Sequence, residues 1–82
     1  MNNHEEIKEL SSLLFSKFNS LTLTTEQTSQ TTNRSVISLQ RDRRNAEGIP
    51  YVKLGRNAGS DKALYNIMDI AKFIVGNRVK TA

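Results

Sequence analysis

The sequence predicts a mainly α fold with a small β-hairpin, namely a winged helix-turn-helix preceded by an N-terminal amphipathic helix. Three observations indicate this arrangement. Apolar residues recur at helical spacing near both ends of the chain. Between them, an arginine-rich helix is followed by Gly48 and Pro50, which end a helix and redirect the chain. The segment 51–54 then has the β-branched and aromatic content of a short strand.

The length of 82 residues fits a single domain with one small core. We expect an N-terminal helix and connection over 1–21, the winged helix-turn-helix over 22–76 and a basic tail over 77–82. No run of about 18 apolar residues occurs, and the acidic start lacks the pattern of a secretory signal. Cytoplasmic residence without membrane contact is therefore expected.

The first helix is expected over residues 5–19. Its apolar stripe recurs at spacings of three and four and consists of Ile7, Leu10, Leu14 and Phe18, widened by Leu13 and Phe15. Packing onto its own domain is the plain interpretation of this stripe. A homodimer contact or the groove of a partner protein are the alternatives.

The second helix is expected over about 25–32, after a connection at 19–22. Thr24 and Gln27 have the spacing of a capping box, in which each side chain bonds the backbone of the other residue. The helix that follows is unusually polar, and its small hydroxylated residues contribute little apolar burial.

A turn at 32–35 leads into the third helix, which is expected over about 36–45. Asn33 tolerates left-handed backbone angles, and Ser35 is a good N-cap. At about 100° per residue, Arg41 points nearly opposite the core-facing Leu39. Ile37 and Arg44 lie on the flanks of Arg41 on this outward face, with Gln40 at one edge and Ser38 at the other. Val36 and the stem of Arg43 lie on the core side with Leu39.

A hairpin is expected next, with strands at 51–54 and 63–65 joined by a basic loop rich in turn formers. Its tip could reach a phosphate or enter a minor groove, and an ordinary solvated turn is the alternative. Asn66 can cap a last helix over 67–75, for which Gly76 is a natural stop. The buried stripe of that helix consists of Ile67, Ile70, Phe73 and Ile74.

Charge is spread unevenly along the chain. Residues 1–33 hold two lysines against four glutamates, a net −2, whereas residues 34–62 hold seven cations against three acids, a net +4. Residues 63–82 add +2, from three cations against one acid. Clustered cations favour a polyanion through counterion release, although a solvated face is the alternative interpretation.

Enzymatic and metal-binding functions find little support in the sequence. There is no cysteine, and the single histidine, His4, lies near a terminus. Neither the serines and threonines nor the carboxylates Asp61 and Asp69 have a nearby base or a glycine-rich phosphate cradle. We expect no cofactor and no metal.

Three stretches together resemble the MerR-like winged helix-turn-helix domains of phage and plasmid excisionases and of AlpA-type regulators, over about residues 22–75. They are Leu23-Thr24-Thr25-Glu26-Gln27; Ser38-Leu39-Gln40-Arg41 with Arg43-Arg44; and Gly48-Ile49-Pro50-Tyr51-Val52-Lys53-Leu54-Gly55, followed by Tyr65, Asp69-Ile70 and Phe73-Ile74. The resemblance implies a DNA-binding domain whose third helix is the recognition helix.

The chain also departs from the family pattern. Thr28-Ser29 replaces the usual pair of alanines, so the second helix should pack less firmly. Asp42 stands where an aromatic or aliphatic residue is usual, and we expect it to be exposed or paired with an arginine, because a buried unpaired carboxylate is costly.

The leading hypothesis is sequence-selective binding of double-stranded DNA, in the service of transcription regulation for a phage or mobile element. An excisionase-like architectural factor is the alternative, and an adaptor that binds a protein through residues 5–19 is the second. Useful affinity would require a homodimer or cooperative side-by-side copies. The expected DNA contacts are Arg34, Ser35, Ser38, Gln40, Arg41 and Arg44 around the recognition helix, and Lys53, Arg56, Asn57 and Lys62 on the wing.

Overall fold

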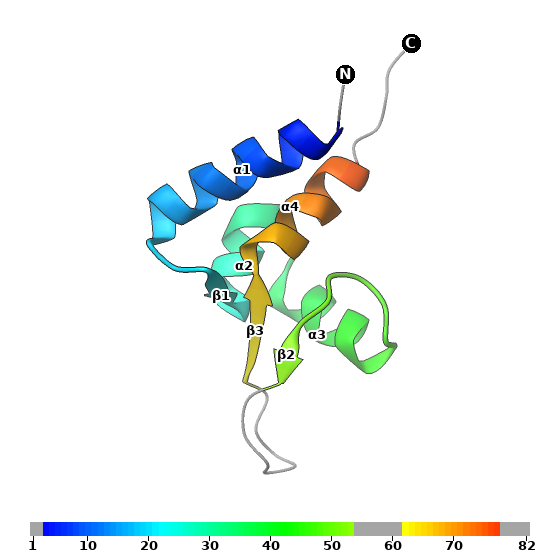
Figure 1. The fold of residues 1–82 in the computed structure, drawn as a ribbon. Coiled ribbons are helices and arrows are strands. Elements are labelled where there is room, and N and C mark those ends of the chain that lie inside the picture. Colours follow the sequence, from blue (N-terminus) through cyan, green and yellow to red (C-terminus); the bar gives the residue numbers. More distant parts are fainter. Residues whose placement is uncertain (1–2, 54–61, 78–82) are drawn as a thin grey trace.

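The computed structural model describes residues 3–53 and 62–77, which form a mainly helical fold with a small antiparallel sheet (Figure 1). In chain order the elements are α1 (Asn3–Phe18), β1 (Thr22–Thr24), α2 (Thr25–Thr32), α3 (Val36–Arg44), β2 (Val52–Lys53), β3 (Ala63–Asn66) and α4 (Ile67–Gly76). Over these described ranges, no helix is both long and apolar enough to cross a membrane.

The sheet has three strands in the order β1-β3-β2, with β3 in the middle. Leu23 pairs with Tyr65 on one side of β3, and Val52 pairs with Leu64 on the other. The expected hairpin of β2 and β3 is present, although β2 begins at Val52 and not at Tyr51, and β3 runs one residue further than expected, to Asn66. The connection expected at 19–22 is wrong at its end, because Thr22 already belongs to β1. A three-residue strand has no pattern of its own, and its long-range pairing with β3 creates it.

Local capping sets the starts of α2, α3 and α4, and these predictions are confirmed. The Thr24 N–H donates to Gln27 Oε1 over 2.9 Å, and the Gln27 N–H donates to Thr24 Oγ1 over 3.1 Å, which completes the capping box. Ser35 Oγ accepts from the Ser38 N–H, and Asn66 Oδ1 accepts from the Met68 N–H. The turn before α3 depends on the left-handed backbone of Asn33, with φ 59°.

The bounds of α1 and α4 differ from the expectation. Helix α1 begins at Asn3, earlier than expected, and ends at Phe18 before the left-handed Asn19. Helix α4 continues through Gly76, which therefore is not its stop. Asn77 caps it instead, because both its backbone N–H and its side-chain amide donate to the carbonyl of Phe73.

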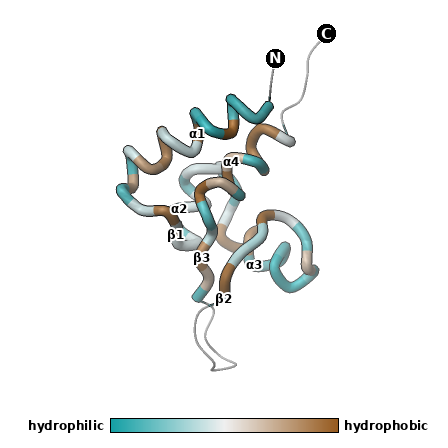
Figure 2. The backbone as a smooth tube through the Cα atoms, in the orientation of Figure 1, coloured by the Kyte–Doolittle hydropathy of each residue, from teal (hydrophilic) through white to brown (hydrophobic). Residues whose placement is uncertain are grey.

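One apolar core joins the elements, and Figure 2 shows its sources as brown segments in α4 and β3. Helix α1 lies along α4 (Figure 1). Its residues Leu10, Leu14 and Phe18 belong to the core or pack against it, so the plain interpretation of the stripe is confirmed. Leu13 and Phe15, however, are exposed and do not widen the buried stripe. The buried cluster consists of Leu14, Leu23, Leu39, Ile49, Ala63, Tyr65, Ile67 and Ile70, with Leu10, Phe18, Phe73 and Ile74 packed against it.

Helix α2 enters this core in spite of its polarity. Thr28 is fully buried, and its hydroxyl donates to the carbonyl of Thr24 over 2.8 Å. Thr32 repeats the arrangement with the carbonyl of Thr28 over 2.7 Å. Because these hydroxyls bond to carbonyls of their own helix, a threonine can be buried here without an unsatisfied polar group.

Candidate nucleic-acid interface

Helix α3 divides its side chains sharply between the core and the solvent. Leu39 is buried, and Val36, Asp42 and Arg43 are half-buried on the same side. The exposed members lie four and three residues apart along the opposite side, and they are Ile37, Arg41 and Arg44. We call these three residues the outer stripe of α3. Its last turn is the hydrophilic, teal end of the helix in Figure 2.

Asp42 forms an ion pair with Arg34, as the expected pairing with an arginine requires. Arg34 Nη2 lies 2.6 Å from Asp42 Oδ2, and the carboxylate side chain is only 14% exposed. The pair connects the turn before α3 to the middle of that helix. The Arg34 guanidinium also lies over the ring of Phe73 in α4, 5.8 Å from its centroid. Arg34 therefore lies apart from the outer stripe, and Asp42 balances its charge.

Gly48 makes room for this carboxylate. Its φ of +83° is strained for an L side chain, and a Cβ there would lie 2.9 Å from Asp42 Oδ2. The loop after α3 comes this close because the Glu47 N–H donates to the carbonyl of Asp42 over 2.9 Å. Ile49, which is buried, then anchors the loop in the core. Glycine at 48 thus permits both the turn and the ion pair.

Arg43 connects α3 to the sheet. Its Nη1 donates to the hydroxyl of Tyr65 over 2.6 Å and to Thr25 Oγ1 over 3.3 Å. The guanidinium lies 5.6 Å from the ring centroid of Tyr51 and 5.9 Å from that of Tyr65. The sequence predicted that the stem of Arg43 would extend the core face, and the structure adds a polar clamp between α3, α2 and β3.

The start of α3 is polar and capped by hydrogen bonds. Ser35 Oγ donates to Ser38 Oγ over 2.9 Å while it accepts the Ser38 N–H, so both predicted contact serines take part in the N-cap. Ser35 is exposed, whereas Ser38 is half-buried on the shoulder of the helix.

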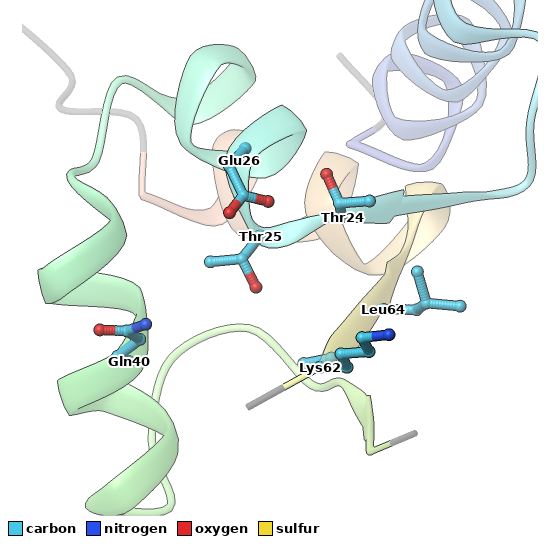
Figure 3. A pocket seen from close by; sticks show the side chains of 7 residues that line it. Thr24, Thr25, Glu26, Gln40, Lys62 and Leu64 are labelled. Carbon is cyan, nitrogen blue, oxygen red and sulfur yellow. The ribbon is translucent and has the colours of Figure 1, made fainter. Parts of the chain in front are cut away.

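Gln40 faces an open cleft between α3 and the base of the hairpin, as Figure 3 shows. It is half-buried and engaged with neighbouring groups, so it belongs to the edge of the helix and not to the outer stripe. Lys62 stands at the other side of the cleft, just before β3. The cleft is lined by Thr24, Thr25, Glu26, Gln40, Lys62, Ala63 and Leu64.

The hairpin contributes two cations among the described residues. Lys53 ends β2 as its register partner Ala63 begins β3, and Lys62 immediately precedes that strand. Both lysines are exposed. The predicted contacts Arg56 and Asn57 lie outside the described residues.

The acidic residues of α1 lie elsewhere, whereas Glu26 at the start of α2 lines the cleft with Gln40 and Lys62. Helix α1, with Glu5 and Glu6 in its first turn, runs along α4 at the top of Figure 1, while α3 lies at the lower right. Within the described ranges, no three His, Cys, Asp or Glu side chains come together in a way that could hold a metal ion. The arginines of the outer stripe and the exposed lysines of the hairpin are the cations that we consider for a ligand.

Ile37 is the member of the outer stripe that the predicted contact set omitted. The helical wheel placed it beside Arg41, and that position was the signal that could have included it. Comparison with protein-family models, with curated proteins and with solved structures finds no match for this chain. The interpretation of the surface depends on its geometry and charge.

Proposed function

We propose that the protein binds double-stranded DNA sequence-selectively, with α2, the turn at 33–35 and α3 acting as a helix-turn-helix and the β2–β3 hairpin as its wing. One observation carries the proposal. Helix α3 exposes Arg41 and Arg44 along one stripe, while its other two charged side chains, Asp42 and Arg43, are held by partners inside the fold.

Such a helix suits the major groove. An α-helix is about 10–12 Å wide with its side chains, and the groove is about 12 Å wide. An arginine can donate two hydrogen bonds to the O6 and N7 atoms of guanine, which gives Arg41 and Arg44 a base-reading role. Lys53 and Lys62 would contact phosphates beside the groove and set the position of the protein without reading sequence.

The internal contacts of α3 support this role because a base-reading helix must be held in one orientation. The Arg34–Asp42 pair fastens α3 to the preceding turn, and Arg43 fastens it to Tyr65 of the central strand. The backbone that carries Arg41 and Arg44 is therefore already held in place before binding, which reduces the conformational entropy that is lost when the complex forms.

A regulator of a phage or mobile-element promoter is the use we favour, acting in the bacterial cytoplasm and on the nucleoid when bound. A single module buries limited surface, so we infer a homodimer or side-by-side copies on adjacent sites. An excisionase-like architectural factor is the alternative. The adaptor hypothesis has less support, because the stripe of α1 that would bind a partner packs on α4 within the chain.

The test is selection from a pool of random duplexes at two salt concentrations, with sequencing of the bound fraction. We expect an enriched motif and binding that weakens steeply as salt rises. Salt-sensitive binding without a motif would favour the architectural factor. Absence of binding at both salt concentrations would contradict the proposed function.

Variants sharpen the assignment. Arg41→Ala and Arg44→Ala should each weaken the selected site by about 1–3 kcal/mol more than they weaken random DNA. Lys8→Ala is the matched control, because Lys8 is an exposed cation on α1. Equal losses on the selected site and on random DNA would remove the arginine in question from the base-reading role.

A further inference from the structure

Ile37 is unusual among the residues of α3, because it is an apolar side chain with 70% of its surface exposed, and it lies at the N-terminal end of a stripe whose other two members are arginines. It is the second residue of the helix, directly after Val36, and its first turn is held by the Ser35 cap. Arg41 lies one helical turn further along the same side, and Arg44 lies nearly two turns further. No acidic side chain of α3 shares this side, since Asp42 is turned toward Arg34.

We propose that Ile37 reads the 5-methyl group of a thymine in the major groove, an inference that rests on the proposed DNA-binding function. In a recognition helix the N-terminal residues contact the base edges, and Ile37 occupies such a position. Its β-branched side chain is stiff about χ1 within a helix, so its methyl groups point in a defined direction.

The chemistry of the base edges selects thymine. Thymine is the base that presents a methyl group in the major groove, whereas adenine, guanine and cytosine present hydrogen-bonding atoms there. A cytosine amino group or a purine N7 placed against Ile37 would lose its water without gaining a partner. Ile37 therefore both attracts thymine and disfavours the other bases.

The spacing of the outer stripe also predicts where the thymine lies. Ile37 and Arg41 are four residues apart, which is about 6 Å along the helix axis. Base pairs stack at about 3.4 Å. The thymine is therefore expected within about two base pairs of the guanine that Arg41 reads.

Other exposed apolar residues do not share this setting. Leu13, 66% exposed, lies on α1, where Glu9 and Lys17 flank it one turn away on either side. A surface of balanced charge does not attract a polyanion. Leu13 is therefore a suitable control for the loss of an exposed aliphatic side chain.

The experiment uses the full chain and the duplex motif obtained by selection. Each thymine of the motif is replaced in turn by deoxyuridine, which lacks the methyl group and keeps the O4 acceptor. Dissociation constants are measured for the wild-type protein, Ile37→Ala and Leu13→Ala. Alanine is the stronger helix former, so Ile37→Ala should retain α3, and circular dichroism would verify it.

For wild type and Leu13→Ala, we expect one thymine-to-uracil replacement to raise the dissociation constant about fourfold, the effect of one buried methyl group. For Ile37→Ala, the same replacement should have no effect. A motif without any methyl-sensitive thymine near the Arg41 guanine, or equal sensitivity in Ile37→Ala, would overturn the inference and leave the proposed function standing. Absence of DNA binding by the wild-type protein would overturn both.

Discussion

The hydrogen bond between Arg43 and Tyr65 offers a direct test of how α3 is held. Tyr65 is 1% exposed, and its hydroxyl accepts from Arg43 Nη1 over 2.6 Å. Tyr65→Phe removes that hydroxyl and leaves the ring in place. A hydrogen bond to a charged group contributes about 1.5–3 kcal/mol, and the half-buried guanidinium can recover part of this from water. We expect the free energy of unfolding to fall by about 1–2 kcal/mol.

A double-mutant cycle isolates this interaction from the rest of the clamp. Arg43→Met keeps much of the stem but removes every contact of the guanidinium, including those with Thr25 and Tyr51. The double variant should lose less stability than the sum of the single variants, by about 1 kcal/mol or more. Urea unfolding followed by circular dichroism measures each value, and an unchanged m-value shows that the two-state comparison holds.

The control for this cycle is Tyr51→Phe. Tyr51 faces Arg43 through its ring, and it is more exposed than Tyr65. Its hydroxyl should therefore show little coupling to Arg43. Single losses for Tyr65→Phe and Arg43→Met that add within about 0.5 kcal/mol would refute the reasoning, because independent sites add within that range.

Three further changes test other parts of the structure. Gly48→Ala should destabilise the fold by more than about 1 kcal/mol, because alanine is strained at φ +83° and its Cβ would collide with the paired Asp42. The control is Ala46→Gly, which relaxes the other left-handed position of the loop and should not destabilise the fold in the same urea assay. Leu14→Ala should lower the free energy of unfolding by about 2–5 kcal/mol, whereas Leu13→Ala on the exposed side of α1 should leave it nearly unchanged. Similar losses for both variants would contradict the packing of α1 on α4. Lys53→Ala should weaken selected and random DNA alike and reduce the slope of log affinity against log salt by about 0.9, so a loss confined to the selected site would place Lys53 at a base edge.

The features predicted well are those made by neighbours in sequence. The capping box of Thr24 and Gln27 and the caps at Ser35 and Asn66 each join residues two or three positions apart. Their hydrogen bonds depend on local backbone geometry, so the residue types at these positions are enough to predict them. The outward direction of Arg41 likewise follows from helical periodicity once Leu39 is taken as buried. These residues determined where α2, α3 and α4 begin and which face of α3 meets solvent.

The features that sequence reasoning missed join residues that are far apart. Strand β1 exists because Leu23 pairs with Tyr65, and an isolated three-residue segment has no pattern to reveal it. The need of Asp42 for a cation was foreseeable from the cost of burying a carboxylate, but the choice of Arg34 was not. The partner of Arg43 was likewise not predicted, because the hydroxyl of Tyr65 lies 22 residues away in the sequence.

The sequence by itself therefore determined the helices, their caps, the hairpin and the stripe of α3 that carries Arg41 and Arg44, because each depends on spacing along the chain. Only the tertiary structure decided which groups hold the other two arginines of α3 and the turn before it. The fold engages Arg34, which the sequence had placed among the DNA contacts, with Asp42, and it engages Arg43 with Tyr65. Such pairings depend on how separate elements pack together, because a charged group that becomes buried is stable only when a partner lies within hydrogen-bond distance.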